Sequence, residues 1–586
     1  KTINAPRRKQ FMNENSSPSK VRLLAIYAYL AMIVAGVKAK YPILGAFGTG
    51  SGKSLGIPMW LAKALGLRIL VAVPRVLNTE DNMKNAQAIW EDSTDKGFGC
   101  ASSKSKRNVR SASVVYATYQ SAIRIFQDFD YVIVDEIHER NAWSDILIAI
   151  LLQKKIGHSL LSATVNEGFW KAYYAQFELK LGVAKGETRK FAIEKCGSIG
   201  PNSAYNIANW LATQNRNTLV FLSDKSKIEE IQSALKGKTN MTVFPLHGDL
   251  EPEERAVFFQ DHKDGYICLA TNIAQAGITP KALAQTLITG EKYSPMLING
   301  QNGIGLQPIS KADFDQQAGR AGRMSDGKCF CTSNVDYDNL PEFDTPEILK
   351  KTPESILLEC LNLGIELSKI KLPTPLPNEV ILAAYQELIR LEAIDEKGLT
   401  SLGKAMLNLQ LSPIAAKIVI EDSYSKESCI LATVLDQWEN ISILKIGEKQ
   451  PINVLEYATT NRVNSDVSDV ISIANALSAA DYDPTHKLSY RTRTALIDVF
   501  KSVKKITGKD YGKNANVFIR DDKAALLKRA MKKVDVSYGN FRLEGVSGNI
   551  CSKSRVNVSG QDIVHGKVTS FKTRRGVITL LVGVTI

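Results

Sequence analysis

The chain has 586 residues, too many for a single hydrophobic core, so we expect about three to five domains. Hydrophobic residues make up 44% of the chain and charged residues 23%, the proportions of an ordinary soluble globular protein. The eight cysteines show no regular spacing, which argues against a disulfide framework and indicates a reducing, intracellular compartment.

The net charge of +14 is concentrated towards the C-terminal end. From Lys501 onward there are 18 Lys and Arg against 6 Asp and Glu, a net charge of +12, which leaves +2 for the first 500 residues. A basic domain attached to a near-neutral body predicts a polyanionic partner. The alternative is a tail whose charge serves only solubility.

Residues 45–54 read GAFGTGSGKS, between an apolar strand start at 41–44 and a helical pattern that opens at Leu55. Glycines let such a loop curl, so that several backbone N–H groups and the helix N-terminus face one phosphate group. Lys53 would neutralise the β- and γ-phosphates of a nucleoside triphosphate, and the Ser54 hydroxyl would bind Mg²⁺. The predicted nucleotide-binding residues are Gly48, Thr49, Gly50, Ser51, Gly52, Lys53 and Ser54.

One position departs from the strict pattern G-x-x-x-x-G-K-[ST], because Phe47 occupies the place of the first glycine. Taken alone, the loop is therefore also compatible with a flexible linker that contains a lysine.

Short apolar runs follow at 69–73, 113–116, 131–134 and 159–161, separated by helical stretches such as 55–65 and 144–152. Continuous apolar strands alternating with helices predict a parallel sheet covered on both faces. Ligands bind such sheets at the carboxyl ends of the strands. Four polar segments fall there: Pro74-Arg75, Thr118, Asp135 to Arg140, and Ser162 to Thr164.

Two carboxylates, Asp135 and Glu136, end the apolar run at 131–134. Asp135 would hold Mg²⁺ through water, and Glu136 would orient and deprotonate the attacking water. An acidic pair at a strand end is usually a solvated turn, but the phosphate loop on the same sheet weakens that alternative.

The segment Asp135-Glu-Ile-His-Glu-Arg140, followed by Asp145-Ile-Leu, resembles the Walker B motif of superfamily 2 helicases of the DEAH/RHA type, with Ile137 in place of the usual Ala. The resemblance places His138 among the catalytic residues. It also implies that the loops carrying Arg75, Thr118 and Thr271 hold a nucleic-acid backbone, and that Ser162 to Thr164 links hydrolysis to strand movement.

The parallel-sheet pattern restarts with strands at 218–222, 242–246 and 266–270 and a helix at 225–235, without a second phosphate loop. This fits a lobe that closes over a nucleotide bound to the first. In the segment from Gln316 to Arg323, Arg320 and Arg323 would be arginine fingers, projecting from one face of a helix because they are three residues apart. Gln316 would contact the γ-phosphate or the attacking water. Gln317 stands where the family usually has arginine.

Residues 293–303 have strand–turn–strand chemistry around Asn299-Gly300, where DEAH/RHA proteins carry a β-hairpin that wedges against nucleic acid. The resemblance extends into the C-terminal third. The expected fold class is α/β, with two tandem RecA-like parallel-sheet domains followed by smaller domains. The predicted domains are an N-terminal extension (1–20), RecA-like domains 1 (21–195) and 2 (196–345), a winged-helix domain (346–409), a helical ratchet-like domain (410–505) and a basic OB-like domain (506–586).

The sequence thus predicts a helicase or translocase that uses ATP or another NTP with Mg²⁺. RNA is the favoured substrate and DNA the alternative, and the resemblance implies 3′-to-5′ movement. Two other hypotheses stay open: a DNA-directed motor of the same fold, and a nucleic-acid-stimulated ATPase that serves as a clamp in a larger particle. We expect no membrane association, and the compact layout would suit a virus or a bacterium.

Overall fold

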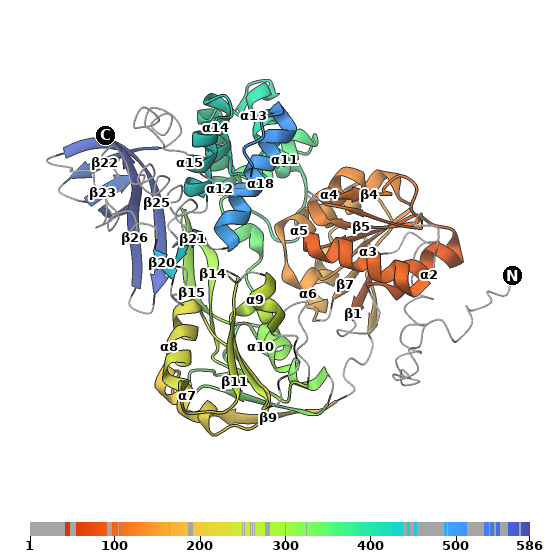
Figure 1. Ribbon diagram of the computed structural model, residues 1–586. Coiled ribbons are helices and arrows are strands. Elements are labelled where there is room, and N and C mark those ends of the chain that lie inside the picture. Colours follow the sequence, from red (N-terminus) through yellow and green to blue (C-terminus); the bar gives the residue numbers. More distant parts are fainter. Residues whose placement is uncertain are drawn as a thin grey trace. The chain divides into compact units, whose positions relative to one another are not determined.

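The computed structural model divides the chain into two compact units, and each is described by itself (Figure 1). The first unit contains residues 1–190, 343–348 and 368–376, and the second contains 191–342, 349–367 and 377–586. The residues that the structure describes are 42–46, 54–90, 97–102, 105–162, 164–185, 191–248, 250, 252–257, 260, 262, 264–275, 282–298, 301–323, 325–436, 442–445, 451–453, 486–488, 490–512, 532–537, 540–543, 546–550, 561–573 and 576–585.

The first unit is built on an eight-stranded sheet with the order β4-β3-β5-β2-β6-β7-β1-β8. All neighbouring strands are parallel except β3 and β4. The predicted parallel sheet is therefore confirmed. Its strands are β1 (Ile43–Ala46), β2 (Ile69–Val73), β3 (Phe98–Ala101), β4 (Lys106–Arg107), β5 (Val114–Thr118), β6 (Tyr131–Val134), β7 (His158–Ser162) and β8 (Gly182–Lys185).

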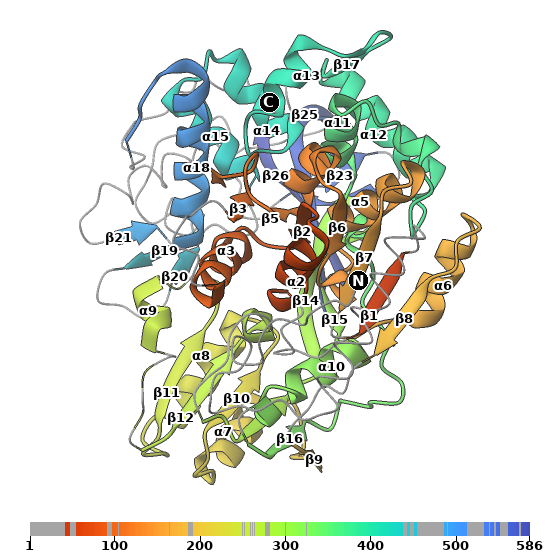
Figure 2. The ribbon, with the colours of Figure 1, turned by 90° about the vertical axis from the view of Figure 1, so that its right-hand side faces the viewer.

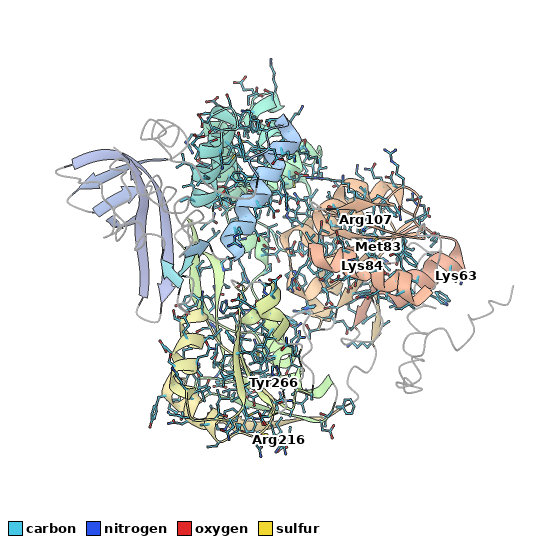
Figure 3. All side chains as sticks on the ribbon, in the orientation of Figure 1. Lys63, Met83, Lys84, Arg107, Arg216 and Tyr266 are labelled. Carbon is cyan, nitrogen blue, oxygen red and sulfur yellow. The ribbon has the colours of Figure 1, made fainter. Side chains whose placement is uncertain are left out.

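Helices cover both faces of this sheet. Along β2, Ile69 and Val71 pack with α2 and α3 in one buried cluster, whereas Leu70 between them points to the opposite face and is equally buried. On α3, Met83 lies in that cluster while its neighbour Lys84 is exposed (Figure 3). The helices are α2 (Gly56–Leu65), α3 (Val76–Trp90), α4 (Tyr119–Ile125), α5 (Ala142–Gln153) and α6 (Glu167–Ala175), with 3₁₀ turns η2 (Phe126–Asp128) and η3 (Ile137–Glu139).

Two short segments from further along the chain, 343–348 and 368–376, are part of the first unit. Glu347 accepts hydrogen bonds from the Asn141 side chain (2.5 Å) and from the backbone N–H of Ala142 (3.3 Å), at the start of α5. The Tyr173 hydroxyl donates to the carbonyl of Lys371 (2.7 Å). The chain therefore returns twice to the helices that follow strands β6 and β7.

The second unit contains a six-stranded, all-parallel sheet with the order β11-β12-β10-β13-β16-β9 (Figure 2). Val220 of β10 packs with α7 and α8, whereas its neighbour Phe221 packs with α10 on the opposite face. Strand β9 spans the predicted boundary at 195/196. The elements are β9 (Ile193–Ser198), α7 (Ala204–Ala212), β10 (Thr218–Phe221), α8 (Lys225–Leu235), β11 (Thr242–Leu246), α9 (Pro252–Ala256), β12 (Tyr266–Ala270), η5 (Asn272–Gln275), β13 (Gln285–Ile288), α10 (Lys311–Ala318), η6 (Ala321–Arg323) and β16 (Gly327–Cys331).

The predicted hairpin is present as the antiparallel strands β14 (Glu291–Ile298) and β15 (Gln301–Pro308), and its turn residues lie outside the described residues. Strand β15 also pairs with β25 near the C-terminus. Strands β22 to β26 pair in a ring, because β25 bonds to both β22 and β26, so they close into the small barrel expected there. These strands are β22 (Lys532–Ser537), β23 (Asn540–Leu543), β24 (Val546–Ile550), β25 (Gln561–Thr573) and β26 (Gly576–Thr585).

Between the hairpin and the barrel, the second unit is mainly helical. A two-stranded wing, β17–β18, follows α12, as expected for a winged-helix domain. In the described part of the chain, no helix combines the length and the hydropathy needed to cross a membrane. The elements of this part of the chain, of which η7 and η8 straddle the boundaries between the units, are η7 (Glu347–Leu349), α11 (Glu354–Asn362), η8 (Leu367–Lys369), α12 (Asn378–Arg390), β17 (Ile394–Asp395), β18 (Gly398–Leu399), α13 (Ser401–Met406), α14 (Pro413–Glu421), α15 (Lys426–Asp436), β19 (Ser442–Lys445), β20 (Pro451–Asn453), β21 (His486–Leu488) and α18 (Tyr490–Thr507).

The central strand β7 buries an imidazole, that of His158, which is 3% exposed. Its ring nitrogens lie 2.7 Å from the Ile156 carbonyl and 2.7 Å from the Tyr174 hydroxyl. Burial lowers the pKa of His158 to about 4. Below its ordinary pKa the unfolded chain therefore binds a proton that the folded chain excludes, so stability falls as the pH drops from about 6.5 towards 4.

We expect His158→Gln to remove this pH dependence. Between pH 7 and pH 5, the free energy of opening of the sheet should fall by about 2 kcal/mol more in the parent than in the variant. Hydrogen exchange at the amides of β6 and β7, measured at both pH values, gives that free energy. An equal fall in both proteins would contradict the assignment.

Candidate active site

The predicted site residues of the first unit follow the carboxyl ends of its parallel strands. Because β1, β2, β5, β6 and β7 run in the same direction, the segments that follow them meet at one edge of the sheet. The loop residues Gly48, Thr49, Gly50, Ser51, Gly52 and Lys53, and the departure at Phe47, lie outside the described residues. Ala163, in the segment from Ser162 to Thr164, also lies outside the described residues, and the other residues predicted for this edge are described.

Ser54 and Asp135 are in direct contact at this edge. The Ser54 hydroxyl, just before α2, donates to Oδ2 of Asp135 at 2.5 Å. Asp135 is 2% exposed, and its other oxygen accepts the backbone N–H of Glu136 at 2.9 Å. The Tyr119 hydroxyl donates to the Asp135 carbonyl at 2.5 Å, which fixes the end of β6. The two residues expected to hold one metal ion are therefore neighbours, and both offer oxygen, the atom that Mg²⁺ prefers.

The turn after Asp135 has an unusual backbone. Glu136 (φ 55°, ψ 39°) and Arg140 (φ 44°, ψ 45°) are both left-handed, and they flank the single 3₁₀ turn η3. A left-handed conformation costs a residue with a Cβ atom about 1–2 kcal/mol, so neighbouring contacts must hold the turn. Contacts with neighbouring residues thus hold Glu136, the candidate base, in its left-handed conformation.

Arg140 supplies such contacts at the far end of the turn. Its guanidinium donates to both carboxylate oxygens of Asp145 (3.2 and 2.9 Å) and to the Thr374 hydroxyl (2.8 Å), and it lies over the ring of Phe169. Burial raises the pKa of Asp145, while the hydrogen bonds and charge of Arg140 oppose that shift. The carbonyl of Arg140 accepts the N–H of Glu347 at 2.9 Å. Contacts from the segments 343–348 and 368–376 therefore help to hold the turn in this conformation.

His138 connects the turn to the next strand. Its Nδ1 atom lies 3.3 Å from Oε2 of Glu136 and 3.1 Å from the hydroxyl of Ser162 at the end of β7. Ser162 donates in turn to the carbonyl of Thr164 at 2.5 Å. The structure thus brings Glu136 and His138 together with Ser162, at the ends of the neighbouring strands β6 and β7.

Arg75 lies at the same edge, after β2. Its guanidinium is half exposed and donates to Oε1 of Glu139 at 3.2 Å. Burial raises the pKa of Glu139, and the charge of Arg75 opposes this shift. Thr118, at the end of β5, donates its hydroxyl to Ser121 at 3.0 Å. Arg75 therefore contacts the turn between Glu136 and Arg140, whereas Thr118 lies opposite Val73 at the end of β5.

In the second unit, Gln316 on α10 belongs to a hydrogen-bonded cluster. The side-chain nitrogen of Gln275 in η5 donates to Oε1 of Gln316 (2.9 Å) and to Asp313. Gln317, 1% exposed, donates to Oε1 of Gln275 at 3.3 Å. Gln317, which stands where the family usually has arginine, thus makes its side-chain hydrogen bond to a residue of the same unit. Thr271 precedes η5, is half-buried, and donates its N–H to the Leu246 carbonyl at 3.1 Å.

The prediction that Arg320 and Arg323 share one helical face was wrong. Helix α10 ends at Ala318, Arg320 lies in the turn that follows, and Arg323 belongs to the separate 3₁₀ turn η6. Gly322 leaves helical geometry there and packs so tightly that a Cβ atom would lie 2.8 Å from Cγ1 of Ile193. Arg320 is 1% exposed, which also differs from a solvated basic turn.

Sequence patterns alone did not indicate Gln275, Asp313 or Lys292, which pairs with Asp313. Their contacts form only when distant parts of the chain pack together. One signal was present: Ser310 and Asp313 have capping-box spacing, and they form that box at the start of α10.

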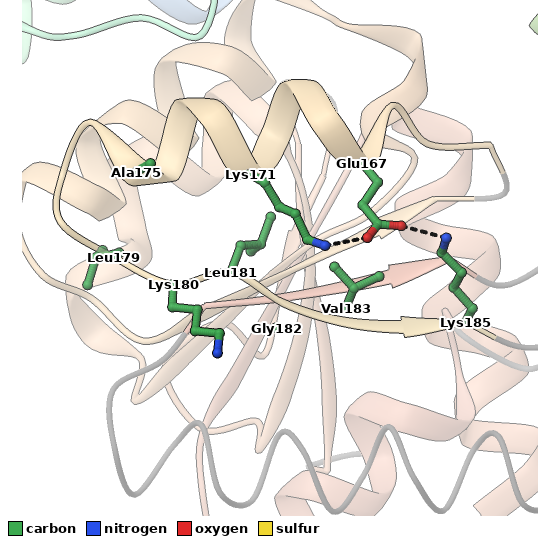
Figure 4. A pocket seen from close by; sticks show the side chains of 9 residues that line it. All are labelled: Glu167, Lys171, Ala175, Leu179, Lys180, Leu181, Gly182, Val183 and Lys185. Carbon is green, nitrogen blue, oxygen red and sulfur yellow. Dashed lines mark hydrogen bonds and ion pairs between the residues drawn. The ribbon is translucent and has the colours of Figure 1, made fainter.

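A separate cavity of about 780 Å³ lies between α6 and β8 and is lined by none of the predicted site residues (Figure 4). Glu167 at its rim bonds to Lys171 and Lys185, both at 2.5 Å. These hydrogen bonds lower the pKa of Glu167 to about 2. Two of the three lysines that line the cavity, Lys171 and Lys185, are therefore already paired with a carboxylate, and we assign no ligand to this cavity.

Comparisons with known proteins agree with the arrangement of the two sheets. Residues 30–170 match the DEAD/DEAH box helicase family, and residues 203–325 match the helicase conserved C-terminal domain. Two Arabidopsis thaliana proteins, the chloroplastic ATP-dependent RNA helicases DEAH11 and DEAH12, are similar to this chain. DEAH11 is 26% identical over 79% of the chain, and DEAH12 is 27% identical over 77% of it. The matched part is 28% of the length of each relative.

Two solved structures of E. coli HrpB share the fold. One is described as a DExH-box NTPase (TM-score 0.69, 97% of this chain, 69% of that chain) and the other as a DEAH/RHA helicase (TM-score 0.67, 96% of this chain, 75% of that chain). Both are 18% identical in sequence to this chain. Together with the motifs at the sheet edge, the family matches show a DEAD/DEAH box helicase domain at residues 30–170 and a helicase C-terminal domain at residues 203–325, and they support the resemblance to superfamily 2 helicases of the DEAH type.

Proposed function

We propose that the protein is an NTP-dependent helicase that moves 3′-to-5′ on single-stranded nucleic acid, preferably RNA, and separates the duplex ahead of it. The observation that carries the proposal is the contact between Ser54 and Asp135, with Glu136 next to it. The names of the Arabidopsis thaliana relatives, which describe ATP-dependent RNA helicases, support the choice of RNA.

The oxygen atoms of Ser54 and Asp135 fit a magnesium ion bound together with the triphosphate. These two residues would hold the ion, and Lys53 would balance the charge of the β- and γ-phosphates. When bound, Mg²⁺ supplies positive charge that favours the triphosphate geometry needed for transfer.

Glu136 is the proposed base. It takes a proton from the attacking water, and His138 at 3.3 Å holds the carboxylate in position. Through its contact with Ser162, His138 would pass a change at Glu136 to the end of β7. The contacts of the turn between Glu136 and Arg140 would hold Glu136 in its left-handed conformation during the reaction. This would limit the reorganisation that proton transfer requires.

Gln316, Arg320 and Arg323 would act on the same triphosphate from the second unit. Gln316 would contact the γ-phosphate or the water, and the two arginines would neutralise the charge that develops on the transferred group. In other NTPases such an arginine contributes a factor on the order of 10³–10⁵ in rate. Release of these contacts after hydrolysis would let the two units part.

Arg75, Thr118 and Thr271 would hold the nucleic-acid backbone. Backbone contacts carry no base information, so the proposed enzyme has little sequence preference and loses affinity steeply with salt. A DNA-directed motor would use the same contacts. A nucleic-acid-stimulated clamp, which turns over NTP without opening a duplex, is the second candidate, and the departures at Phe47 and Gln317 keep it open.

Glu136→Gln should retain ATP and Mg²⁺ binding but lose hydrolysis by roughly two orders of magnitude or more, because the water loses its base while Asp135 remains. Lys53→Ala should lose nucleotide binding as well. Phosphate release and nucleotide titration measure the two effects. Asp128→Asn, at an exposed carboxylate of the same unit, is the matched control and should behave as the parent. Equal turnover in Glu136→Gln and the parent would refute the assignment of the base.

Strand displacement tests the proposed function as a whole. Matched RNA and DNA duplexes with a 3′ or a 5′ overhang are incubated with the protein and ATP, and release of the displaced strand is followed. We expect faster release from the RNA duplex with a 3′ overhang. Equal or faster release from DNA would favour the DNA-directed motor, and turnover stimulated by single strands without displacement would favour the clamp.

A further inference from the structure

Strand β14 carries a buried charge that the predicted mechanism does not use. Lys292 is 5% exposed, at an inward-facing position of the strand, and its ammonium lies 2.5 Å from Oδ2 of Asp313 on α10. Asp313 is 8% exposed. A buried lysine is costly unless a carboxylate pairs with it, so the two residues depend on each other.

Asp313 ties this pair to the group predicted to touch the nucleotide. Its carboxylate accepts the backbone N–H of Ser310 at 3.1 Å, in the capping box of α10. The same carboxylate accepts a hydrogen bond from Gln275, whose side-chain nitrogen also donates to Gln316. In this series of hydrogen bonds, Gln275 therefore links Gln316 directly to the ion pair of Lys292 and Asp313.

The electrostatics hold Asp313 in its charged form. Burial alone would raise its pKa, but the charge of Lys292 and the hydrogen bonds from Lys292, Gln275 and Ser310 hold the pKa below its usual value. The carboxylate therefore stays a hydrogen-bond acceptor for all of its partners near neutral pH.

The other end of the connection is the barrel. Strand β14 pairs along its whole length with β15, from Glu291 opposite Pro308 to Ile298 opposite Gln301. Strand β15 pairs in turn with β25, from Gly303 opposite Ser570 to Gly305 opposite Lys572. Backbone pairing through β15 thus joins β14, the strand that carries Lys292, to β25 of the basic C-terminal barrel.

We propose that the Lys292–Asp313 pair is the joint through which the nucleotide contact of Gln316 controls the β14–β15 hairpin and, through it, the grip of the second unit on nucleic acid. The inference rests on the proposed function, because it takes Gln316 to touch the nucleotide. Lys292 and Asp313 are positioning residues: a shift of Gln316 moves Gln275, Asp313 and the base of the hairpin together.

The test compares the affinity of the full chain for a fluorescent single-stranded RNA in the presence of a non-hydrolysable ATP analogue and in the presence of ADP. The ratio of the two dissociation constants measures the coupling between nucleotide and strand. The variants are Lys292→Met, Asp313→Asn and the double variant. The double variant removes both charges, so it leaves no unpaired buried ion and should fold even if a single variant does not. Thermal unfolding checks the fold, and Lys311→Met, on the same helix, is the matched control.

We expect the ratio in the parent to differ from one by a factor of about five or more, and to fall to within about twofold of one in the double variant. NTP turnover is measured in parallel, and loss of the ratio in a folded variant that still hydrolyses NTP separates the role of the pair from the catalytic contact of Gln316 itself. The single variants that fold should show the same loss as the double variant, since each breaks the same joint.

A folded double variant that keeps the ratio of the parent would overturn the proposal. A parent with no difference between the two nucleotides would overturn it as well, since there would be no signal to transmit. Failure of the proposed function gives a different result, namely a parent that binds RNA in a nucleotide-dependent way but neither hydrolyses NTP nor opens a duplex.

Discussion

The contact between Ser54 and Asp135 is the constraint on which the account of the first unit depends. It exists because β1 and β6 are parallel strands of one sheet, so the segments that leave their carboxyl ends arrive at the same edge. A serine and an aspartate far apart in the sequence thereby come into contact, in an arrangement that would suit a single ion. Glu136, the proposed base, follows Asp135 directly.

The turn from Glu136 to Arg140 shows how that edge is maintained. Two left-handed residues are unfavourable by themselves, and the chain stabilises them with contacts from both sides. His138 reaches Ser162 at the next strand, while Arg140 reaches Asp145 and the returning Thr374. Thr374 and Glu347, in the two segments that return to the first unit, show that distant parts of the chain hold this turn in place.

Much of this architecture could be predicted from the sequence, because local patterns determine it. The strands β2, β11 and β12 and the helix α8 have the predicted bounds, since apolar runs and helical periodicity are local signals. Such reasoning failed at Arg320 and Arg323: spacing suggested one helix for both, but α10 ends at Ala318 and Gly322 leaves helical geometry inside the separate turn η6. The pairing of Lys292 with Asp313, and the return of segments 343–348 and 368–376, depend on tertiary packing that no local pattern records.

The most direct test of the account is the magnesium dependence of nucleotide affinity. Binding of a non-hydrolysable ATP analogue is measured with Mg²⁺ and with a chelator, for the parent and for Asp135→Asn. We expect Mg²⁺ to tighten binding by about tenfold or more in the parent and by less than about twofold in the variant, with metal-free binding retained in both. Unchanged magnesium dependence in Asp135→Asn would contradict the claim that this edge of the sheet holds the ion and its triphosphate.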